Sequence, residues 1–361
     1  MGTVRLEFLE TPGHTPEGVS VVIFDGTHPE PFGVLTGDTL FVGDVGRPDL
    51  LASIGYTSEQ LGRMLYHSLH DKLLRLPDAT RVFPAHGAGS MCGKALGTER
   101  STTIGEQKQL NYALQPMSED AFLKLVTEDQ PTAPRYFVHD AVLNRQGRPT
   151  LAELLQHAKP MSPAEARREM ALGAVLLDTR DADPFAARHV RGSLNIDLDG
   201  KFATWAGSVL DADARIVVLA EPGREKESLV RLGRVGLDRV AGYVEGGIEA
   251  FPPDAVERAE RVTADELQVL RETNAVQVLD VREASERATG AIPGSLHVSL
   301  KELPDRLAEL PRETELVVHC AGGYRSSAAA SFLRARGWRA RDLAGGYAAW
   351  AETQGGEAAR P

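Results

Sequence analysis

The chain repeats itself at a spacing of about 100 residues, and this repeat constrains the fold more than any other feature. Four short segments recur in the same order in residues 160–255 and 258–355. The matched pairs are VLLDTR with QVLDVR, RGSLNIDL with PGSLHVSL, RIVVLA with ELVVHC, and VEGGIEAF with LAGGYAAW. Matches that keep one order at one spacing mean that a single structural unit occurs twice. The sequence therefore predicts a first copy of one domain at 160–255 and a second copy at 258–355.

Each copy alternates short apolar runs with helical patterns. In the second copy, Val276–Val281 and Leu316–His319 are rich in Val and Leu and predict buried strands. Ala264–Glu272 and Ser326–Arg336 predict helices, the latter closed by Gly337. Strands that alternate with helices favour a parallel sheet covered by helices on both faces. We therefore expect both copies to be α/β domains.

Residues 1–115 have a different pattern. Gly- and Pro-rich turns separate short predicted strands, among them Val19–Phe24 and Val34–Thr36. One helix is predicted at about residues 58–76, and residues 116–159 predict a helical connector to the first copy. This organisation agrees with a length of 361 residues, which suggests two or three domains.

Charge and cysteine content restrict the function and the compartment. The chain has 40 Lys and Arg against 51 Asp and Glu, a net charge of −11, which argues against a general nucleic-acid binder because such proteins need a basic face. The two cysteines, Cys92 and Cys320, lie far apart and give no disulfide framework, as expected in a reducing compartment. The sequence has no apolar run of about 18 residues and no apolar signal-peptide core, so we expect a cytoplasmic protein without a membrane span.

Cys320 stands at a position suited to nucleophilic chemistry. It follows a predicted strand and opens the loop CAGGYRS, after which a helix begins. A cysteine that carries a transferable sulfur must be a thiolate, and a helix N-terminus stabilises negative charge on sulfur. Gly322 and Gly323 allow successive backbone N–H groups to face the sulfur, and Arg325 can hold an anion. The alternative is a buried, inert cysteine that ends a strand.

The second copy resembles a rhodanese domain. The resemblance rests on Asp280-Val281-Arg282, Ile292-Pro293-Gly294-Ser295, the loop Cys320–Ser326, and Gly345-Gly346 with Trp350. It implies a doubly wound parallel sheet and sulfurtransferase activity, with Cys320 and Arg325 as the catalytic residues and Cys320 carrying a persulfide. The other loop residues implied to bind the substrate are Ala321, Gly322, Gly323, Tyr324 and Ser326.

The first copy lacks the nucleophile. Ala220 stands in register with Cys320, within LAEPGREKE, and alanine has no thiol to attack a sulfur. Asp178, Arg180 and Gly192-Ser193 persist, which indicates a retained fold without the chemistry. We therefore interpret residues 160–255 as an inactive rhodanese-like domain that serves packing, docking or orientation.

Three turns in the N-terminal region each place a His or an Asp just past a predicted strand. They are TPGHT with His14, TGDTL with Asp38, and FPAHG with His86. Metal sites are assembled in this way at the rim of a sheet, whereas a lone His in a turn is more often structural. The three in series predict a metal site.

The same turns resemble the second half of a metallo-β-lactamase domain, an αββα fold. DTLFVGDVGRPDL and LYHSLHDKLLRLPDATRVFPAHGAGSMCG are similar to the persulfide dioxygenase branch that is fused to rhodanese domains. The resemblance implies Fe(II), with Zn²⁺ as the alternative. It assigns His14 as a His ligand, Asp38 as the carboxylate ligand and His86 as the last His of the fold, usually outer-shell in this branch. It also implies a structural role for Arg47 and Asp49.

One part of the metallo-β-lactamase pattern is missing. The signature His-x-His-x-Asp-His should precede TPGHT by many residues, and His67 and His70 in HSLHD do not have its spacing. We therefore expect an incomplete metal site, poor iron retention, negligible dioxygenase activity, and self-association through the uncovered sheet of residues 1–115. Cys92, in GSMCGK, is either a loop residue typical of the family or a thiol that relays sulfur.

The leading functional hypothesis is a sulfurtransferase of sulfane-sulfur metabolism. Its expected partners are small sulfur anions such as thiosulfate, low-molecular-weight persulfides, and thiol or cyanide acceptors. Two alternatives remain: a metal-dependent thioester hydrolase of glyoxalase-II type, which needs the missing His-rich motif, and a non-enzymatic sulfur carrier or docking protein.

Overall fold

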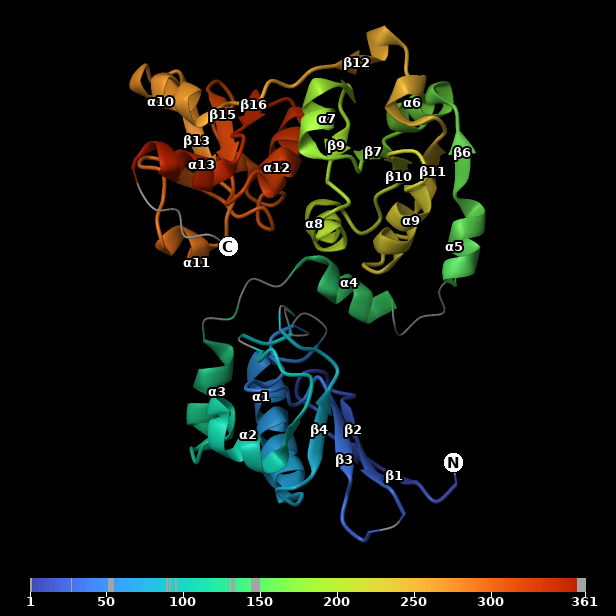
Figure 1. The fold of residues 1–361 in the computed structure, drawn as a ribbon, viewed down its shortest axis with the longest axis vertical. Helices are drawn as coiled ribbons and strands as arrows, with labels where there is room; N and C mark the ends of the chain where they lie inside the picture. The colour runs from blue at the N-terminus through green and yellow to red at the C-terminus, as the bar shows by residue number, and fades with distance from the viewer. Residues whose placement is uncertain are drawn as a thin grey trace. The chain divides into compact units, whose positions relative to one another are not determined.

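The computed structural model describes residues 2–26, 28–50, 55–88, 90, 92–94, 96–128, 130, 134–143 and 150–355. The chain divides into two compact units, residues 1–133 and 134–361, and Figure 1 labels their helices and strands. Of the helices described, none is both long enough and apolar enough to cross a membrane. Each unit is described by itself below.

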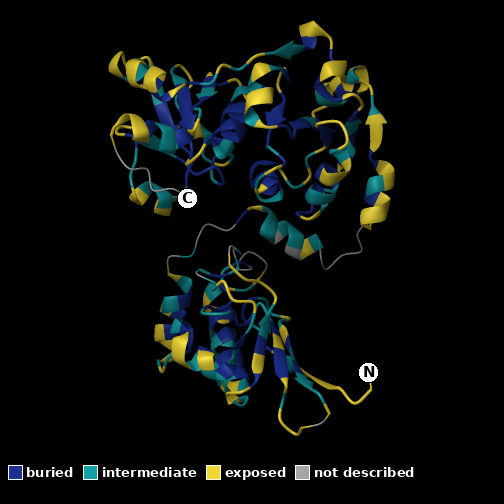
Figure 2. Ribbon diagram, in the orientation of Figure 1, coloured by how far each residue is buried: buried dark blue, intermediate teal, exposed yellow. Residues whose placement is uncertain are grey.

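The N-terminal unit is built on one five-stranded sheet, with strand order β1-β2-β3-β4-β5. The first three strands run antiparallel, β4 runs parallel to β3, and β5 is antiparallel to β4. Figure 2 shows that β1 is exposed along much of its length, and Phe8 is 68% exposed. The strands are β1 (Arg5–Glu10), β2 (Val19–Phe24), β3 (Gly33–Gly37), β4 (Arg81–Pro84) and β5 (Thr102–Thr103).

The expected helix over residues 58–76 is not a single α-helix. It is α1 (Ser58–His67), then a π-helical segment (Ser68–Lys72) and a 3₁₀ turn (Leu73–Arg75). The leucines that face the core lie four residues apart, at positions 61, 65, 69 and 73, and all are fully buried. A four-residue spacing drifts around an α-helix of 3.6 residues per turn, and a wider π turn brings the later leucines back toward the core.

The N-terminal unit also contains α2 (Ile104–Leu110) and α3 (Glu119–Thr127), with a 3₁₀ turn (Tyr112–Leu114) between them. The helix α3 packs against α1, where Gly62 leaves room for the side chain of Leu123. The first part of residues 116–159, the segment expected to connect the domains, is therefore packed into this unit as α3. The helix α5 (Leu151–His157) from the same segment belongs to the other unit, where it packs against α9 (Glu225–Gly233).

The C-terminal unit contains two parallel sheets, one for each predicted copy. The first sheet has the order β6-β11-β10-β7-β9 and the second has the order β14-β13-β15-β16. The central strands of both sheets are buried, as Figure 2 shows. The first sheet consists of β6 (Lys159–Met161), β7 (Val175–Asp178), β9 (Leu194–Asn195), β10 (Ile216–Leu219) and β11 (Val240–Val244). The second consists of β13 (Val276–Asp280), β14 (Leu296–His297), β15 (Glu315–His319) and β16 (Ala340–Asp342).

Helices surround both sheets, which confirms the predicted α/β class. A short antiparallel pair, β8 (His189–Val190) with β12 (Val256–Glu257), lies outside the two sheets. The helices of the first copy and its approach are α4 (Tyr136–Leu143), α5, α6 (Pro163–Ala171), α7 (Ala182–Ala187), α8 (Phe202–Val209) and α9 (Glu225–Gly233). Those of the second are α10 (Ala264–Glu272), α11 (Ala284–Ala288), α12 (Tyr324–Arg334) and α13 (Gly346–Thr353). The 3₁₀ turns are Gly247–Ala250, Pro253–Ala255 and Leu307–Glu309.

The helix expected over Ser326–Arg336 is shifted by two residues. It is α12, which starts at Tyr324 because Gly323 adopts the left-handed conformation, with φ of +106°, and reverses the loop at once. At the other end the helix stops at Arg334. Gly337, also left-handed, closes a turn in which its N–H donates to the carbonyl of Arg334.

The two copies pack against each other through α12 and the edge of the first sheet. Buried apolar residues from both copies form one continuous core. Within it, Asn195 of the first copy bonds to two serines of α12. Its N–H donates to the hydroxyl of Ser331 at 3.0 Å, and its Oδ1 accepts from Ser327 at 2.7 Å. The first copy is thus fixed to the helix that follows the predicted nucleophile.

Candidate active site and candidate metal centre

Cys320 lies at the C-terminal end of β15, a central strand of the second sheet, and is 1% exposed. The backbone N–H of Gly323 donates to its Sγ at 3.1 Å, and Sγ lies 3.7 Å from the hydroxyl of Ser326. A Gly323 N–H aimed at sulfur stabilises negative charge there, as the sequence predicted for this loop. The side chain is therefore placed for thiolate chemistry at the start of α12.

The loop that carries Cys320 is held from behind by α13. The carbonyl of Cys320 accepts from the N–H of Tyr347 at 2.7 Å, and that of Ala321 accepts from Ala348 at 3.0 Å. A Cβ on Gly346 would lie 2.6 Å from the carbonyl oxygen of Cys320. This close approach explains the glycine pair at the start of α13, because any side chain at Gly346 would push the loop away.

Arg325 does not stand free beside the sulfur. Its guanidinium forms two bonds of 2.6 Å to the carboxylate of Glu286 in α11, and it lies 5.7 Å from the ring centre of Trp205 in the first copy. Burial alone would raise the pKa of Glu286, but the bonds from Arg325 outweigh it, so the pKa is lowered and the carboxylate is charged. An anionic substrate must therefore compete with Glu286 for Arg325.

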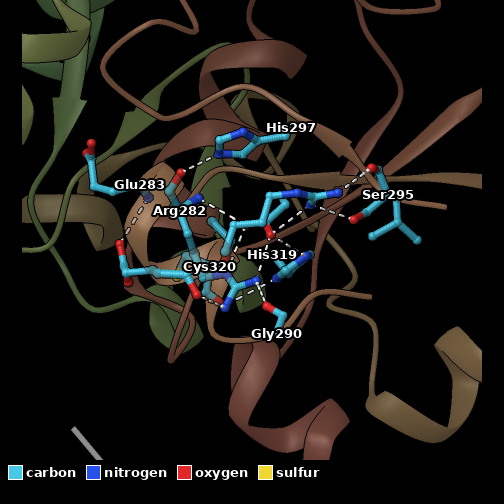
Figure 3. Close-up of polar contacts among 12 residues, drawn as sticks. Arg282, Glu283, Gly290, Ser295, His297, His319 and Cys320 are labelled. Carbon is cyan, nitrogen blue, oxygen red and sulfur yellow. Dashed lines mark hydrogen bonds and ion pairs between the residues drawn. The ribbon is translucent and has the colours of Figure 1, made fainter. Parts of the chain in front are cut away.

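A polar network supports the end of β13 next to the nucleophile, as Figure 3 shows. Arg282 bonds to both carboxylate oxygens of Asp280, at 3.0 and 2.8 Å, and donates to the carbonyl of Gly290 at 2.7 Å. Its own carbonyl lies 2.9 Å from Nε2 of His297. The bidentate pair neutralises the buried Asp280 and fixes the turn after β13.

His319 precedes Cys320 and is fully buried. Burial lowers its pKa to about 4, although the nearby Asp280 opposes the shift. The imidazole is therefore neutral at physiological pH. His319 therefore adds no positive charge to this part of the site.

The first copy contributes to the site, which the sequence did not reveal. The hydroxyl of Tyr324 donates to the carbonyl of Asp197, and the Tyr324 ring lies against Gly200, where a Cβ would be 2.5 Å from it. Trp205, also from the first copy, lies beside Arg325. The first copy therefore contacts two loop residues of the second copy, Tyr324 and Arg325. No local pattern could identify them, because each contact joins positions more than 100 residues apart.

In the first copy, the equivalent position is Ala220 at the end of β10, as predicted. The turn differs as well: the N–H of Gly223 donates to the carboxylate of Glu225 at 2.9 Å. Pro222 also has no N–H to offer. This turn therefore has neither a thiol nor the same set of N–H donors.

The three predicted metal ligands come together at one end of the N-terminal sheet. Nδ1 of His14 lies 2.9 Å from the carbonyl of Arg47, and its Nε2 lies 3.7 Å from Oδ2 of Asp38. Nδ1 of His86 bonds to the other oxygen, Oδ1 of Asp38, at 2.7 Å. Arg47 and Asp49, predicted to be structural, form a bidentate ion pair, with Arg47 1% exposed.

This arrangement fits a metal ion. The carbonyl of Arg47 can only accept, so Nδ1 of His14 carries a proton, and burial lowers the pKa of this histidine, so the ring is neutral. Its Nε2 then offers a lone pair toward a carboxylate oxygen. Two electron-rich atoms facing each other, too far apart for a hydrogen bond, are the expected surroundings of a cation.

The two copies are similar to known rhodanese-like domains. The family model for the rhodanese-like domain matches residues 162–252 and 263–353. A sulfurtransferase of Allochromatium vinosum is 36% identical over 85 residues, which cover 23% of this chain and 79% of that protein. An uncharacterized protein of Mycobacterium tuberculosis, Rv2581c, is 36% identical over 118 residues, 33% of this chain, and the chain spans 44% of that protein's length.

A solved structure is similar to about two thirds of the chain. The metallo-beta-lactamase from Staphylococcus aureus subsp. aureus COL is 30% identical to this chain with a TM-score of 0.55, over 67% of this chain and 68% of that one. Together with the two matched rhodanese-like segments, this similarity confirms the predicted fusion. The chain belongs to the rhodanese-like family and joins a metallo-β-lactamase-like region to two rhodanese-like domains.

Proposed function

We propose that the chain is a sulfurtransferase that carries sulfane sulfur as a persulfide on Cys320. The observation that carries this proposal is the N–H of Gly323 aimed at Sγ from the start of α12. Cys320 is also the one cysteine within the two copies. The similarity to a sulfurtransferase of known sequence supports the same class of reaction.

Two steps complete the proposed transfer. The Cys320 thiolate attacks the outer sulfur of thiosulfate, the S–S bond of thiosulfate breaks, and sulfite leaves with the bonding electron pair. An acceptor thiolate or cyanide then attacks the outer sulfur of the persulfide and releases the Cys320 thiolate. In both steps the Gly323 N–H stabilises the charge on Cys320. Arg325 binds the anionic donor after it releases the carboxylate of Glu286.

We propose that the first copy positions the loop and takes no part in the covalent chemistry. Its contacts with Tyr324 and Arg325 limit how far these residues can move when a donor enters. Donors and acceptors in this proposal are small sulfur anions and low-molecular-weight thiols or persulfides. The chain acts in the cytoplasm, and the exposed strand β1 serves self-association.

The N-terminal unit adds a metal site to this proposal. His14 and Asp38 hold the ion, and His86 orients Asp38 from outside. The sequence resemblance favours Fe(II), with Zn²⁺ as the alternative. A bound ion would supply a Lewis acid that polarises a sulfur anion lying against it, and we expect negligible dioxygenase activity from this chain. The residues of this chain contribute the buried, neutral His14 imidazole and the Asp38 carboxylate held by His86.

The transfer is tested by measuring thiocyanate formed from thiosulfate and cyanide with the full chain. Cys320→Ser should abolish the activity while circular dichroism stays unchanged. The matched control is Ala220→Ser, which introduces the same hydroxyl at the equivalent position of the first copy and should retain activity. Substantial thiocyanate formation by Cys320→Ser would show that another group carries the sulfur.

A further inference from the structure

Cys92 joins the two predicted metal ligands in space. One donor atom from each of His14, Asp38 and Cys92 lies within 4.8 Å of the other two. The three residues follow three different strands, β1, β3 and β4, so the fold and not the local sequence brings them together. Cys92 is half-buried and takes part in no disulfide.

Backbone contacts from one residue fix two of these donors. The carbonyl of Arg47 faces Nδ1 of His14 at 2.9 Å, and the N–H of Arg47 donates to the carbonyl of Cys92 at 2.9 Å. The N–H of Cys92 donates in turn to the hydroxyl of Ser90 at 3.2 Å. The position of Cys92 beside His14 is therefore a consequence of ordered backbone bonds on both sides of the residue.

Two glycines permit this close assembly. A Cβ on Gly46 would lie 1.9 Å from the carbonyl oxygen of Asp38 and 2.9 Å from the Cβ of His14. A Cβ on Gly93 would lie 2.7 Å from a carboxylate oxygen of Asp44. A side chain at Gly46 would push apart the segments that carry His14 and Asp38, and one at Gly93 would push the segment that carries Cys92 away from Asp44.

The distance between the His14 and Asp38 donor atoms suits a tetrahedral ion. Metal–ligand bonds of about 2.0–2.3 Å place tetrahedral donors about 3.3–3.8 Å apart, and Nε2 of His14 lies 3.7 Å from Oδ2 of Asp38. Oδ1 of Asp38 is occupied by His86, which leaves Oδ2 for the ion. Three protein donors and one open position form the usual arrangement of a reactive zinc site.

We propose that Cys92 is a metal ligand and completes a His14–Asp38–Cys92 site with His86 as its outer support. This inference rests on the proposed metal site at His14 and Asp38, and it names the third donor and the class of ion. A thiolate ligand favours a soft or borderline cation such as Zn²⁺. Fe(II), by contrast, is typically held by nitrogen and oxygen ligands alone. The cysteine thus has a role separate from sulfur transfer at Cys320.

The test uses cobalt, which replaces zinc and reports its ligands by colour. The metal-free full chain is titrated with Co²⁺, and visible d–d bands show binding while a near-ultraviolet band shows a thiolate–cobalt bond. We expect both signals in the natural chain and in Cys320→Ser, the matched cysteine control. Cys92→Ser should lose the thiolate band, and its Zn²⁺ affinity should fall at least about 10–100-fold.

The outcomes separate this inference from the proposal on which it rests. Bound Co²⁺ without a thiolate band in the natural chain would overturn the role of Cys92 and leave the site at His14 and Asp38 standing. No bound Co²⁺ would overturn both. A thiolate band that persists in Cys92→Ser would assign the bond to a different cysteine and contradict the inference.

A second measurement does not depend on how Cys92→Ser folds. In Cys320→Ser, Cys92 is the one remaining thiol. Zn²⁺ should therefore slow its alkylation by iodoacetamide at least about tenfold, since a coordinated sulfur has no free electron pair of comparable reactivity. His14→Ala in the same background should remove this protection. Equal alkylation rates with and without Zn²⁺ would contradict a Cys92–metal bond.

Discussion

The two rhodanese-like copies share their structural residues and differ in those that perform chemistry. Arg180 bonds to Asp178 at 2.9 and 2.6 Å in the first copy, and Arg282 bonds to Asp280 at 3.0 and 2.8 Å in the second. Each arginine also donates to a backbone carbonyl eight residues later, at 2.7 Å. A buried bidentate pair at the same point of both copies identifies these residues as part of the fold.

The copies diverge where the central strand meets the next helix. The second copy ends β15 with His319 and then Cys320, whereas the first ends β10 with Leu219 and then Ala220. The following turn points an N–H at sulfur in one copy and at the carboxylate of Glu225 in the other. The strand–loop–helix frame is therefore common to both copies, whereas the nucleophile and the N–H donor aimed at it occur only in the second.

The largest expected effect comes from moving the nucleophile between the copies. In a chain with Cys320→Ser and Ala220→Cys, the thiol count is unchanged, but the new thiol meets a turn with Pro222 and Glu225. We expect thiocyanate formation to stay on the order of 10³-fold or more below that of the natural chain. Substantial recovery of the rate would mean that the thiol alone makes the site and that the loop donors matter little.

Removing Arg325 should produce an intermediate effect. A charge-assisted bond to an anion contributes about 1.5–3 kcal/mol, so Arg325→Ala should lower kcat/KM for thiosulfate by roughly 10–150-fold. An uncharged persulfide donor should lose much less. The control is Arg224→Ala, which removes an arginine from the corresponding turn of the first copy. Equal losses for both donors would assign Arg325 to holding Glu286 and shaping the loop.

The smallest effect concerns stability and its dependence on pH. Because burial lowers the pKa of His319 from 6.5 to about 4, the unfolded chain takes up a proton that the folded chain refuses in this interval. Stability is therefore lost as pH falls from about 6.5 toward 4, by about 2 kcal/mol between pH 7.5 and 5. His319→Leu, which copies Leu219, should remove this part of the loss.

The measurement is denaturant unfolding followed by tryptophan fluorescence. All three tryptophans, Trp205, Trp338 and Trp350, belong to the C-terminal unit, so the signal reports that unit alone. His189, whose pKa burial also lowers to about 4, leaves a residual pH dependence in every variant. His157→Leu, at an exposed position, is the control. An unchanged pH dependence in His319→Leu would contradict a neutral, buried His319.

The sequence predicts the parts of this molecule that local patterns and repeats determine. The helix Ala264–Glu272 has the predicted bounds because Thr263 and Glu266 form a capping box at its start. The π turn after α1 was missed because it depends on where the leucines meet the core. Glu286 and Trp205 were missed beside Arg325 because both contacts are long-range, and neither residue stands in a motif.

The most direct test of the central claim locates the transferred sulfur. The full chain is incubated with thiosulfate, separated from it, digested, and examined by mass spectrometry before and after cyanide. We predict one added sulfur atom on the peptide that contains Cys320, and its loss on treatment with cyanide. Sulfur found on Cys92 with Cys320 unmodified, or no added sulfur while thiocyanate is produced, would contradict the assignment of Cys320 as the sulfur carrier.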